Sequence, residues 1–139
     1  MPTSPRRTAA RIAATVALLV ASAHVAPPAQ AAPPAQERVT WQQVVDWTYA
    51  YADKYGADPE DMLRIARCES RGNPYAIGAL GEVGPYQMHP RGIWTSSPQA
   101  KAGYSIYDTE ATVASAAWVY SKGWAYTTLG WYWCANNAW

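Results

Sequence analysis

Apolar side chains recur at intervals of three and four residues between Thr40 and Gly56, which is the spacing of one face of a helix. Thr40 and Gln43 match a capping box, in which each side chain bonds the backbone N–H of the other. Gly56 suits the left-handed conformation that ends many helices. These signals predict a helix between the two caps. Its buried face is expected to contain Trp41, Val44, Val45, Thr48, Tyr51, Ala52 and Tyr55.

A second helix is predicted directly after the first. Asp58 is a good N-cap, Pro59 fits the first helical position, and the acids that follow favour the positive end of the helix dipole. The helix carries Cys68 and Glu69 near its C-terminal end and stops before Gly72. Its buried face is expected to contain Met62, Leu63, Ile65 and Ala66.

The segment from Arg71 to about Gly103 shows no two-residue alternation, so we expect little strand there. Glycines and prolines punctuate it, and both favour turns. A loop of this length is uncommon unless it is functional or disordered. Interleaved apolar side chains favour an ordered, functional loop; they are Tyr75, Tyr86, Met88, Ile93 and Trp94.

Helical spacing returns after Asp108, whose side chain suits an N-cap. The pattern predicts a helix over about 109–122, ended by Gly123. The aromatic tail, 124–139, is expected to pack back onto the fold through Cys134. The chain is therefore predicted to be mainly α-helical, with a long glycine-rich loop and little or no strand.

The first thirty-one residues predict a secretory signal peptide. A basic start with Arg6 and Arg7 precedes an apolar run over 12–23, which is shorter than the roughly 20 residues that a membrane span needs. The Ala29-Gln30-Ala31 sequence matches a cleavage site. We therefore predict a signal at 1–31, an Ala/Pro-rich flexible entry at 32–39 and one folded domain at 40–139. A secreted protein, without a membrane segment after signal cleavage, is expected.

Charge and histidine content exclude several classes of protein. After removal of the predicted signal, eight basic residues face ten acidic ones, which gives a formal charge of −2 and no basic stripe for nucleic acid. His89 is then the only histidine, and no cysteine cluster accompanies it, so no metal site or cofactor is expected. Pairing of His89 with Glu82 or with a backbone carbonyl is expected instead.

The two cysteines, Cys68 and Cys134, are predicted to form a disulfide because export favours oxidation. The alternative is a pair of buried free thiols. A bond between them would tie the segment beside Glu69 to the C-terminal tail.

The aromatic content is one-sided, with eight Trp, ten Tyr and no Phe. Tyr and Trp combine a flat apolar face with a polar group, a combination that suits sugar rings, although a share of them is expected in the core. Glu69 stands at the end of a predicted helix, before the glycine-rich loop. A rigidly held acid that faces groups able to orient a glycan is the arrangement that sugar cleavage needs.

Three short motifs occur in order: Glu69-Ser70, then Asn73-Pro74-x-Ala76, then Gly84-x-x-Gln87-Met88. Together they resemble the signature of the soluble lytic transglycosylase domain, which shares the lysozyme-like fold with goose-type lysozymes. The resemblance covers about residues 40–134. The cysteine before Glu69 and the Trp-rich tail are also similar to the resuscitation-promoting factors of actinobacteria.

The resemblance implies a peptidoglycan-cleaving enzyme that acts as a monomer on the MurNAc–GlcNAc β-1,4 bond of glycan strands. Glu69 would be the catalytic acid, and the product would be a 1,6-anhydro sugar. The resemblance places Ser70, Tyr86, Gln87 and Met88 at the substrate, whereas Asn73 would hold the loop and Gly84 would let the backbone approach the glycan. The Ala-Tyr-Asn-Ala-Gly motif of the family is absent, and Tyr120 is the candidate replacement.

Glu82 leaves the reaction type open. As an auxiliary carboxylate it could activate water, which would make the protein a hydrolytic muramidase. Alternatively, Glu82 hydrogen-bonds loop amides. A glycan-binding module without catalysis is a further reading, based on the tryptophan and tyrosine content.

Overall fold

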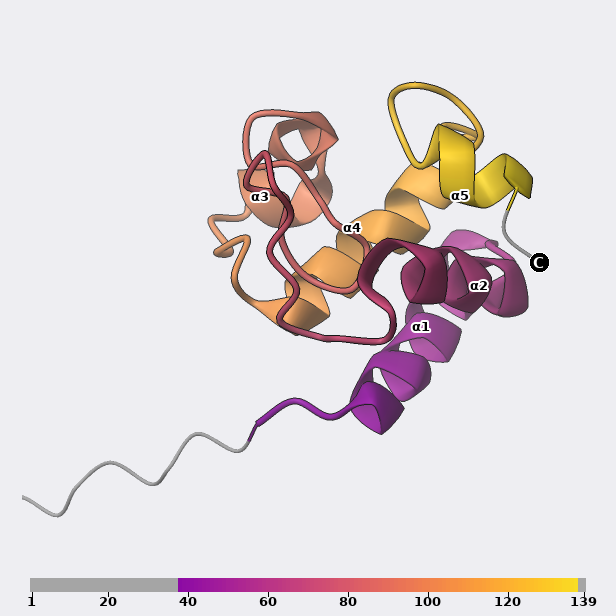
Figure 1. Ribbon diagram of the computed structural model, residues 1–139, viewed down its shortest axis with the longest axis horizontal. Helices are drawn as coiled ribbons and strands as arrows, with labels where there is room; N and C mark the ends of the chain where they lie inside the picture. The colour runs from indigo at the N-terminus through magenta and orange to yellow at the C-terminus, as the bar shows by residue number, and fades with distance from the viewer. Residues whose placement is uncertain (1–37, 138–139) are drawn as a thin grey trace, which may run out of the picture. The chain divides into compact units, whose positions relative to one another are not determined.

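The computed structural model describes residues 38–137, and they are mainly helical (Figure 1). The predicted signal peptide and residues 32–37 of the predicted entry lie outside the described residues. The described elements are α1 (Trp41–Tyr55), α2 (Pro59–Ser70), the 3-10 helix η1 (Ile93–Ser96), α3 (Pro98–Lys101), α4 (Thr109–Ser121) and α5 (Tyr132–Asn137).

The capping signals set the boundaries of the first two helices. Thr40 and Gln43 form the capping box at the start of α1, and Gly56 ends that helix at φ 70°. Asp58 accepts bonds from two backbone N–H groups of the first turn of α2, with Pro59 at the first helical position. Arg71 ends α2 with a φ of 54°, which confirms the predicted stop before Gly72.

The segment predicted as one loop, from Arg71 to about Gly103, contains two short helices, η1 and α3, in its last third. Two isolated antiparallel bridges fold the loop on itself, from Ile77 to Val83 and from Val83 to Met88. Asn73 holds its start, since its side-chain oxygen accepts the backbone N–H of Tyr75 at 2.9 Å.

Helix α4 lies at the centre of the domain and contacts both α1 and α3 (Figure 1). Nine of its thirteen residues are buried. All nine are alanine, valine, serine or threonine, and such small side chains let neighbouring helices approach closely. Asp108 caps its N-terminus through the N–H of Ala111, as predicted.

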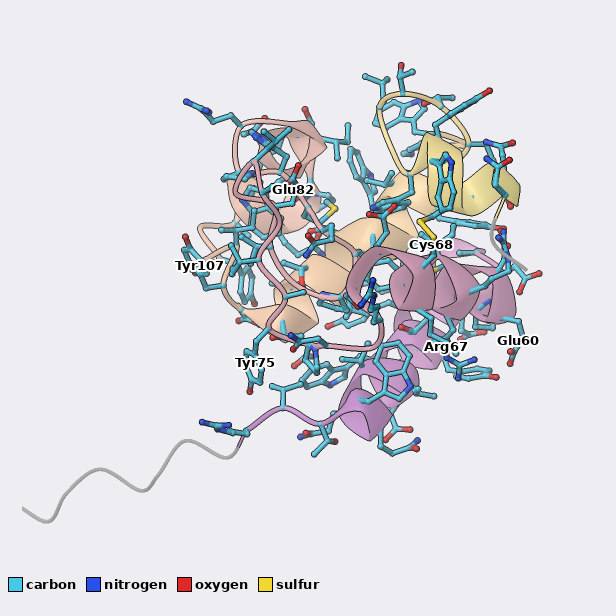
Figure 2. All side chains as sticks on the ribbon, viewed as in Figure 1. Glu60, Arg67, Cys68, Tyr75, Glu82 and Tyr107 are labelled. Atoms are coloured by element: carbon cyan, nitrogen blue, oxygen red, sulfur yellow. A yellow bond between two sulfur atoms is a disulfide. The ribbon has the colours of Figure 1, made fainter. Side chains whose placement is uncertain are left out.

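Two links fasten α5 to α2. Cys68 and Cys134 form the predicted disulfide, with Cα atoms 5.7 Å apart, visible as the yellow bond beside Cys68 in Figure 2. Arg64 donates hydrogen bonds to the carbonyls of Cys134 and Ala135, both at 2.9 Å. The short helix α5 therefore has a fixed place beside the C-terminal half of α2.

Removing the disulfide by Cys68→Ser together with Cys134→Ser should lower the free energy of unfolding by about 4 kcal/mol, because the bond closes a 66-residue separation in the unfolded chain. Urea denaturation measures the change. Reductant should weaken the wild-type protein by a similar amount and leave the double variant unaffected. Equal stability of oxidised wild type and double variant would contradict the prediction.

Candidate active-site groove

A groove of about 460 Å³ opens beside the C-terminal end of α2. Three parts of the chain line it: the helix end at Glu69, the loop from Gly78 to Gly92 with the first residue of η1, and the segment 128–131 that precedes α5. The loop contributes Gly78, Ala79, Glu82, Gln87, His89, Gly92 and Ile93, and the last segment contributes Thr128, Leu129, Gly130 and Trp131. The groove therefore brings together Glu69, Glu82 and Gln87 of the residues singled out in the sequence.

Glu69 is half-buried at the groove wall, and the pKa of its carboxyl lies above the ordinary value. Burial is the main cause, since it penalises the charged form, and the negative charge of Glu82 adds to it. The position in the last turn of α2 acts in the same direction, because a helix C-terminus disfavours a carboxylate. These effects favour the protonated acid.

Glu82 has a structural contact as well as a place in the groove. Its Oε2 accepts the backbone N–H of Leu80 at 3.0 Å, which is the loop-amide bond considered in the sequence analysis. Gly78 makes room for it, because a Cβ there would lie 2.3 Å from Glu82 Oε2 and 2.6 Å from Gln87 Oε1. A side chain at residue 78 would therefore force both polar groups to move.

Gln87 is held in one orientation by the loop. Its backbone has a φ of 46°, and its Nε2 donates to the carbonyls of Ala76 and Gly84, at 3.2 and 2.9 Å. Both amide hydrogens are therefore used within the loop. The amide oxygen is the part of the Gln87 side chain that remains to accept a bond from a ligand.

His89 also lines the groove, and the pairing predicted for it is wrong. Its Nδ1 accepts the backbone N–H of Arg91 at 3.1 Å, instead of pairing with Glu82 or with a carbonyl. In the neutral imidazole the proton is then on Nε2, which leaves that atom as a donor.

Tyr86 and Met88 do not reach the groove, because both are buried in the core with relative exposures of 0% and 1%. The hydroxyl of Tyr86 bonds the hydroxyl of Thr48 at 2.9 Å. The Tyr86 ring packs against Trp131 with centroids 5.6 Å apart, and the Tyr86 carbonyl accepts the indole N–H of Trp131. Tyr86 thus supports the groove wall from behind.

Ser70 and Tyr120 do not line the groove either. The Ser70 hydroxyl is buried and donates to the Ala66 carbonyl at 2.8 Å, one turn back in α2. Tyr120 donates to Asp61 at 2.8 Å, near the opposite end of α2. Since Asp61 and Glu69 are eight residues apart, about 12 Å of helix separates them.

Gly84 packs against α4 instead of facing the groove. It is buried with a φ of 80°, and a Cβ there would lie 3.1 Å from the hydroxyl oxygen of Thr112. Its left-handed backbone serves the turn of the loop, where its N–H donates to the Ala76 carbonyl at 2.8 Å.

The segment 128–131 is the part of the groove that sequence reasoning missed. Gly130 allows it to close on the chain before it, because a Cβ at that position would lie 2.4 Å from the carbonyl oxygen of Trp124. The signal that could have located this wall is Cys134: a disulfide to Cys68, beside Glu69, brings the preceding residues to the same place.

Comparisons of the chain with protein-family models, with curated proteins and with solved structures found no match. Within residues 38–137, no group of three or more His, Cys, Asp or Glu side chains is placed to hold a metal ion. None of the helices described here has the length and apolar character of a membrane span.

Replacing the neighbouring acid by Glu82→Gln should lower the pKa of Glu69, because one negative charge near it is lost. The pKa should stay above the ordinary glutamate value, since burial is unchanged. A carbon-13 NMR titration of the side-chain carboxyls measures both values. Asp53→Asn, at an exposed acid of α1, is the control and should leave the pKa of Glu69 unchanged. An unchanged Glu69 pKa in Glu82→Gln would contradict the electrostatic link.

Proposed function

We propose that this chain is an exported, monomeric peptidoglycan-cleaving enzyme with a lysozyme-like fold, acting on the MurNAc–GlcNAc β-1,4 bond as a lytic transglycosylase. The observation that carries the proposal is the half-buried Glu69, with its raised pKa, in the wall of a groove. The motif resemblance around Glu69, Gln87 and the loop between them supports it.

The proposed reaction begins with Glu69 in its protonated form. Its carboxyl gives a proton to the glycosidic oxygen, the C1–O bond breaks, and the GlcNAc portion leaves as an alcohol. The carboxylate of Glu69 then accepts the proton of the muramyl C6 hydroxyl while that oxygen bonds to C1. The product is a 1,6-anhydro ring, and Glu69 ends with its original proton.

A single carboxylate suffices in this scheme because the nucleophile belongs to the substrate. The enzyme has no water to position and must only hold the sugar so that its C6 hydroxyl reaches C1. Burial matters for the first step, because an acid with an ordinary pKa would be ionised near neutral pH and could not donate a proton.

Other groove residues suit a hexosamine strand. The free amide oxygen of Gln87 is an acceptor for the N–H of an acetamido group. Ile93 and Leu129 provide apolar surface for the C–H faces of the rings. His89 adds a donor through Nε2 when its ring is neutral. Sugars need this combination of apolar faces and oriented polar atoms.

A hydrolytic muramidase is the second candidate, and one observation favours it. Glu82 lies in the same groove and is close enough for its charge to raise the pKa of Glu69. In this scheme Glu69 is the acid, and Glu82 activates the water that attacks C1. Its hydrogen bond to Leu80 would hold the carboxylate in place for that role.

Glu69→Gln should abolish solubilisation of purified sacculi, with a loss of at least about 100-fold, since the amide cannot donate the proton that the leaving oxygen needs. Release of soluble muropeptides measures the rate. Asp53→Asn changes an exposed carboxylate of α1 and should keep wild-type activity. Wall cleavage that survives in Glu69→Gln would refute the role of Glu69. Wild-type protein that binds sacculi without cleaving them would instead be a glycan-binding module.

The mass of the muropeptides separates the two reaction types. A lytic transglycosylase releases products one water lighter than hydrolysis products, and Glu82→Gln should keep most of the activity because glutamine still accepts the Leu80 N–H. A muramidase releases ordinary reducing ends and should lose its activity in Glu82→Gln. Mass spectrometry of digests by the two proteins tests this, and reducing-end products from wild type would exclude the lyase.

A further inference from the structure

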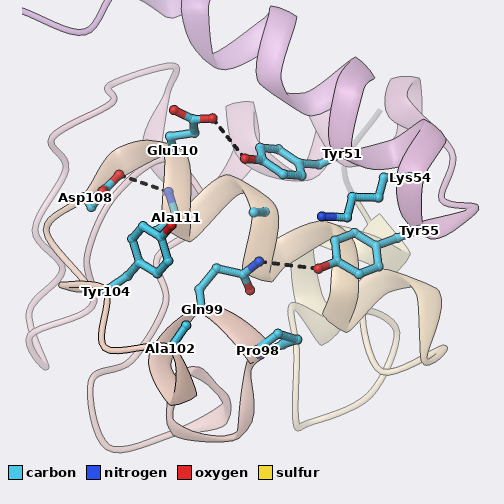
Figure 3. A pocket seen from close by; sticks show the side chains of 11 residues that line it. Tyr51, Lys54, Tyr55, Pro98, Gln99, Ala102, Tyr104, Asp108, Glu110 and Ala111 are labelled. Atoms are coloured by element: carbon cyan, nitrogen blue, oxygen red, sulfur yellow. Dashed lines mark hydrogen bonds between the residues drawn. The ribbon is translucent and has the colours of Figure 1, made fainter.

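A second hollow, of about 360 Å³, lies between the C-terminal half of α1 and the opposite wall formed by α3, the loop after it and the start of α4 (Figure 3). It shares no lining residue with the groove at Glu69. Figure 3 shows side chains from both walls pointing toward one another across it. The aromatic and polar side chains among them include Tyr51, Lys54, Tyr55, Gln99, Tyr104 and Glu110.

Tyrosine rings give this hollow flat apolar surfaces. Tyr104 stands at its edge with 57% of its surface exposed, whereas Tyr51 and Tyr55 are half-buried along α1. The ammonium of Lys54 lies 5.9 and 5.5 Å from the centroids of the Tyr51 and Tyr55 rings. Tyr51 and Tyr55 also pack against the buried core, so each offers the hollow only part of its ring, whereas Tyr104 is exposed at the edge.

The polar groups among these rings are held in place by hydrogen bonds. Glu110 Oε1 accepts the hydroxyl of Tyr51 at 2.9 Å, which leaves Oε2 with free acceptor positions. Gln99 bonds the hydroxyls of Tyr55 and Ser115, at 3.4 and 3.0 Å. A ligand that binds here would meet groups that are already ordered, so little side-chain entropy would be lost.

Both the shape and the charge of the hollow suit an uncharged, polar ligand. Lys54 contributes one positive charge, and Asp108 and Glu110 contribute two negative ones, so no strong field of either sign selects an ion. Partial burial raises the pKa of Tyr51 to about 12, so its hydroxyl stays neutral. A pyranose ring complements these walls, because its C–H face can stack on tyrosine and its hydroxyls can donate to a carboxylate.

We propose that this hollow is a second saccharide-binding site, which takes one or two N-acetylhexosamine rings of a glycan strand at a distance from the cleavage groove. The choice of N-acetylhexosamine among sugars rests on the proposed function of the groove. Binding at two sites raises the effective concentration of an insoluble strand near Glu69. The enzyme would then stay on the wall between cleavage events.

The test is an NMR titration of the full secreted chain, carrying Glu69→Gln to prevent turnover, with tetra-N-acetylchitotetraose. We expect saturable shifts at the amides of Gln99, Tyr104 and Glu110. Tyr104→Ala should lower the sugar affinity reported by the shifts at the hollow about fivefold, because one aromatic contact is lost. The shifts at the groove should stay unchanged. Tyr132→Ala is the matched control, because Tyr132 is equally exposed, at 57%, and lies on α5.

Shifts confined to groove residues such as Gln87 and Leu129 would overturn the second site, as would shifts at the hollow produced by a wall stem peptide and not by the sugar. An equal effect of Tyr132→Ala would overturn it as well. Sacculus digestion by wild type separates the two proposals. Cleavage without binding at the hollow refutes only the second site, whereas sugar binding at the hollow without cleavage refutes only the enzyme.

Discussion

The disulfide between Cys68 and Cys134 is the constraint on which the groove depends. Glu69 follows one of these cysteines directly, and the wall at 128–131 precedes the other by three residues. One covalent bond therefore sets the acid and the opposite wall relative to each other. Arg64 reinforces the same junction through two carbonyls of α5. Without these links α5, which has only six residues, would have little to hold it.

Local signals predicted the elements whose ends are chemically marked. Thr40, Asp58 and Asp108 each place a side-chain acceptor at a helix N-terminus, so α1, α2 and α4 could be located within a residue or two. Among the short elements, α3 has such a mark in Ser97 and Pro98, which the sequence analysis did not use, whereas η1 has no side-chain cap. A 3-10 turn at η1 and a six-residue α5 are stabilised by the tertiary contacts around them, which periodicity does not contain. The tail was therefore predicted to pack back, but not as a helix.

The candidate site could likewise be predicted only in part. Glu69, Glu82 and Gln87 could be selected from the motif, and the fold brings them to one groove. The motif did not predict whether its other side chains point into the groove or into the core. Tyr86 and Met88 both enter the core while Gln87 faces out, which is the alternation of an extended segment even though the Gln87 backbone is left-handed. The spacing of the motif does not record which of these side chains faces the core, because that depends on how the left-handed turns at Gly84 and Gln87 orient the segment.

The position of the cysteines also determines when the groove can be completed. The chain from Cys68 to Cys134 includes the loop wall of the groove and the central helix α4. During synthesis, Glu69 is present long before its opposite wall exists, and the last covalent step needs an oxidant that a reducing cytoplasm does not supply. Closure of the groove is thus tied to oxidation of the two thiols, which can occur only after Cys134 has been synthesised. The disulfide that holds Glu69 in place is thus also the step that completes the groove around it.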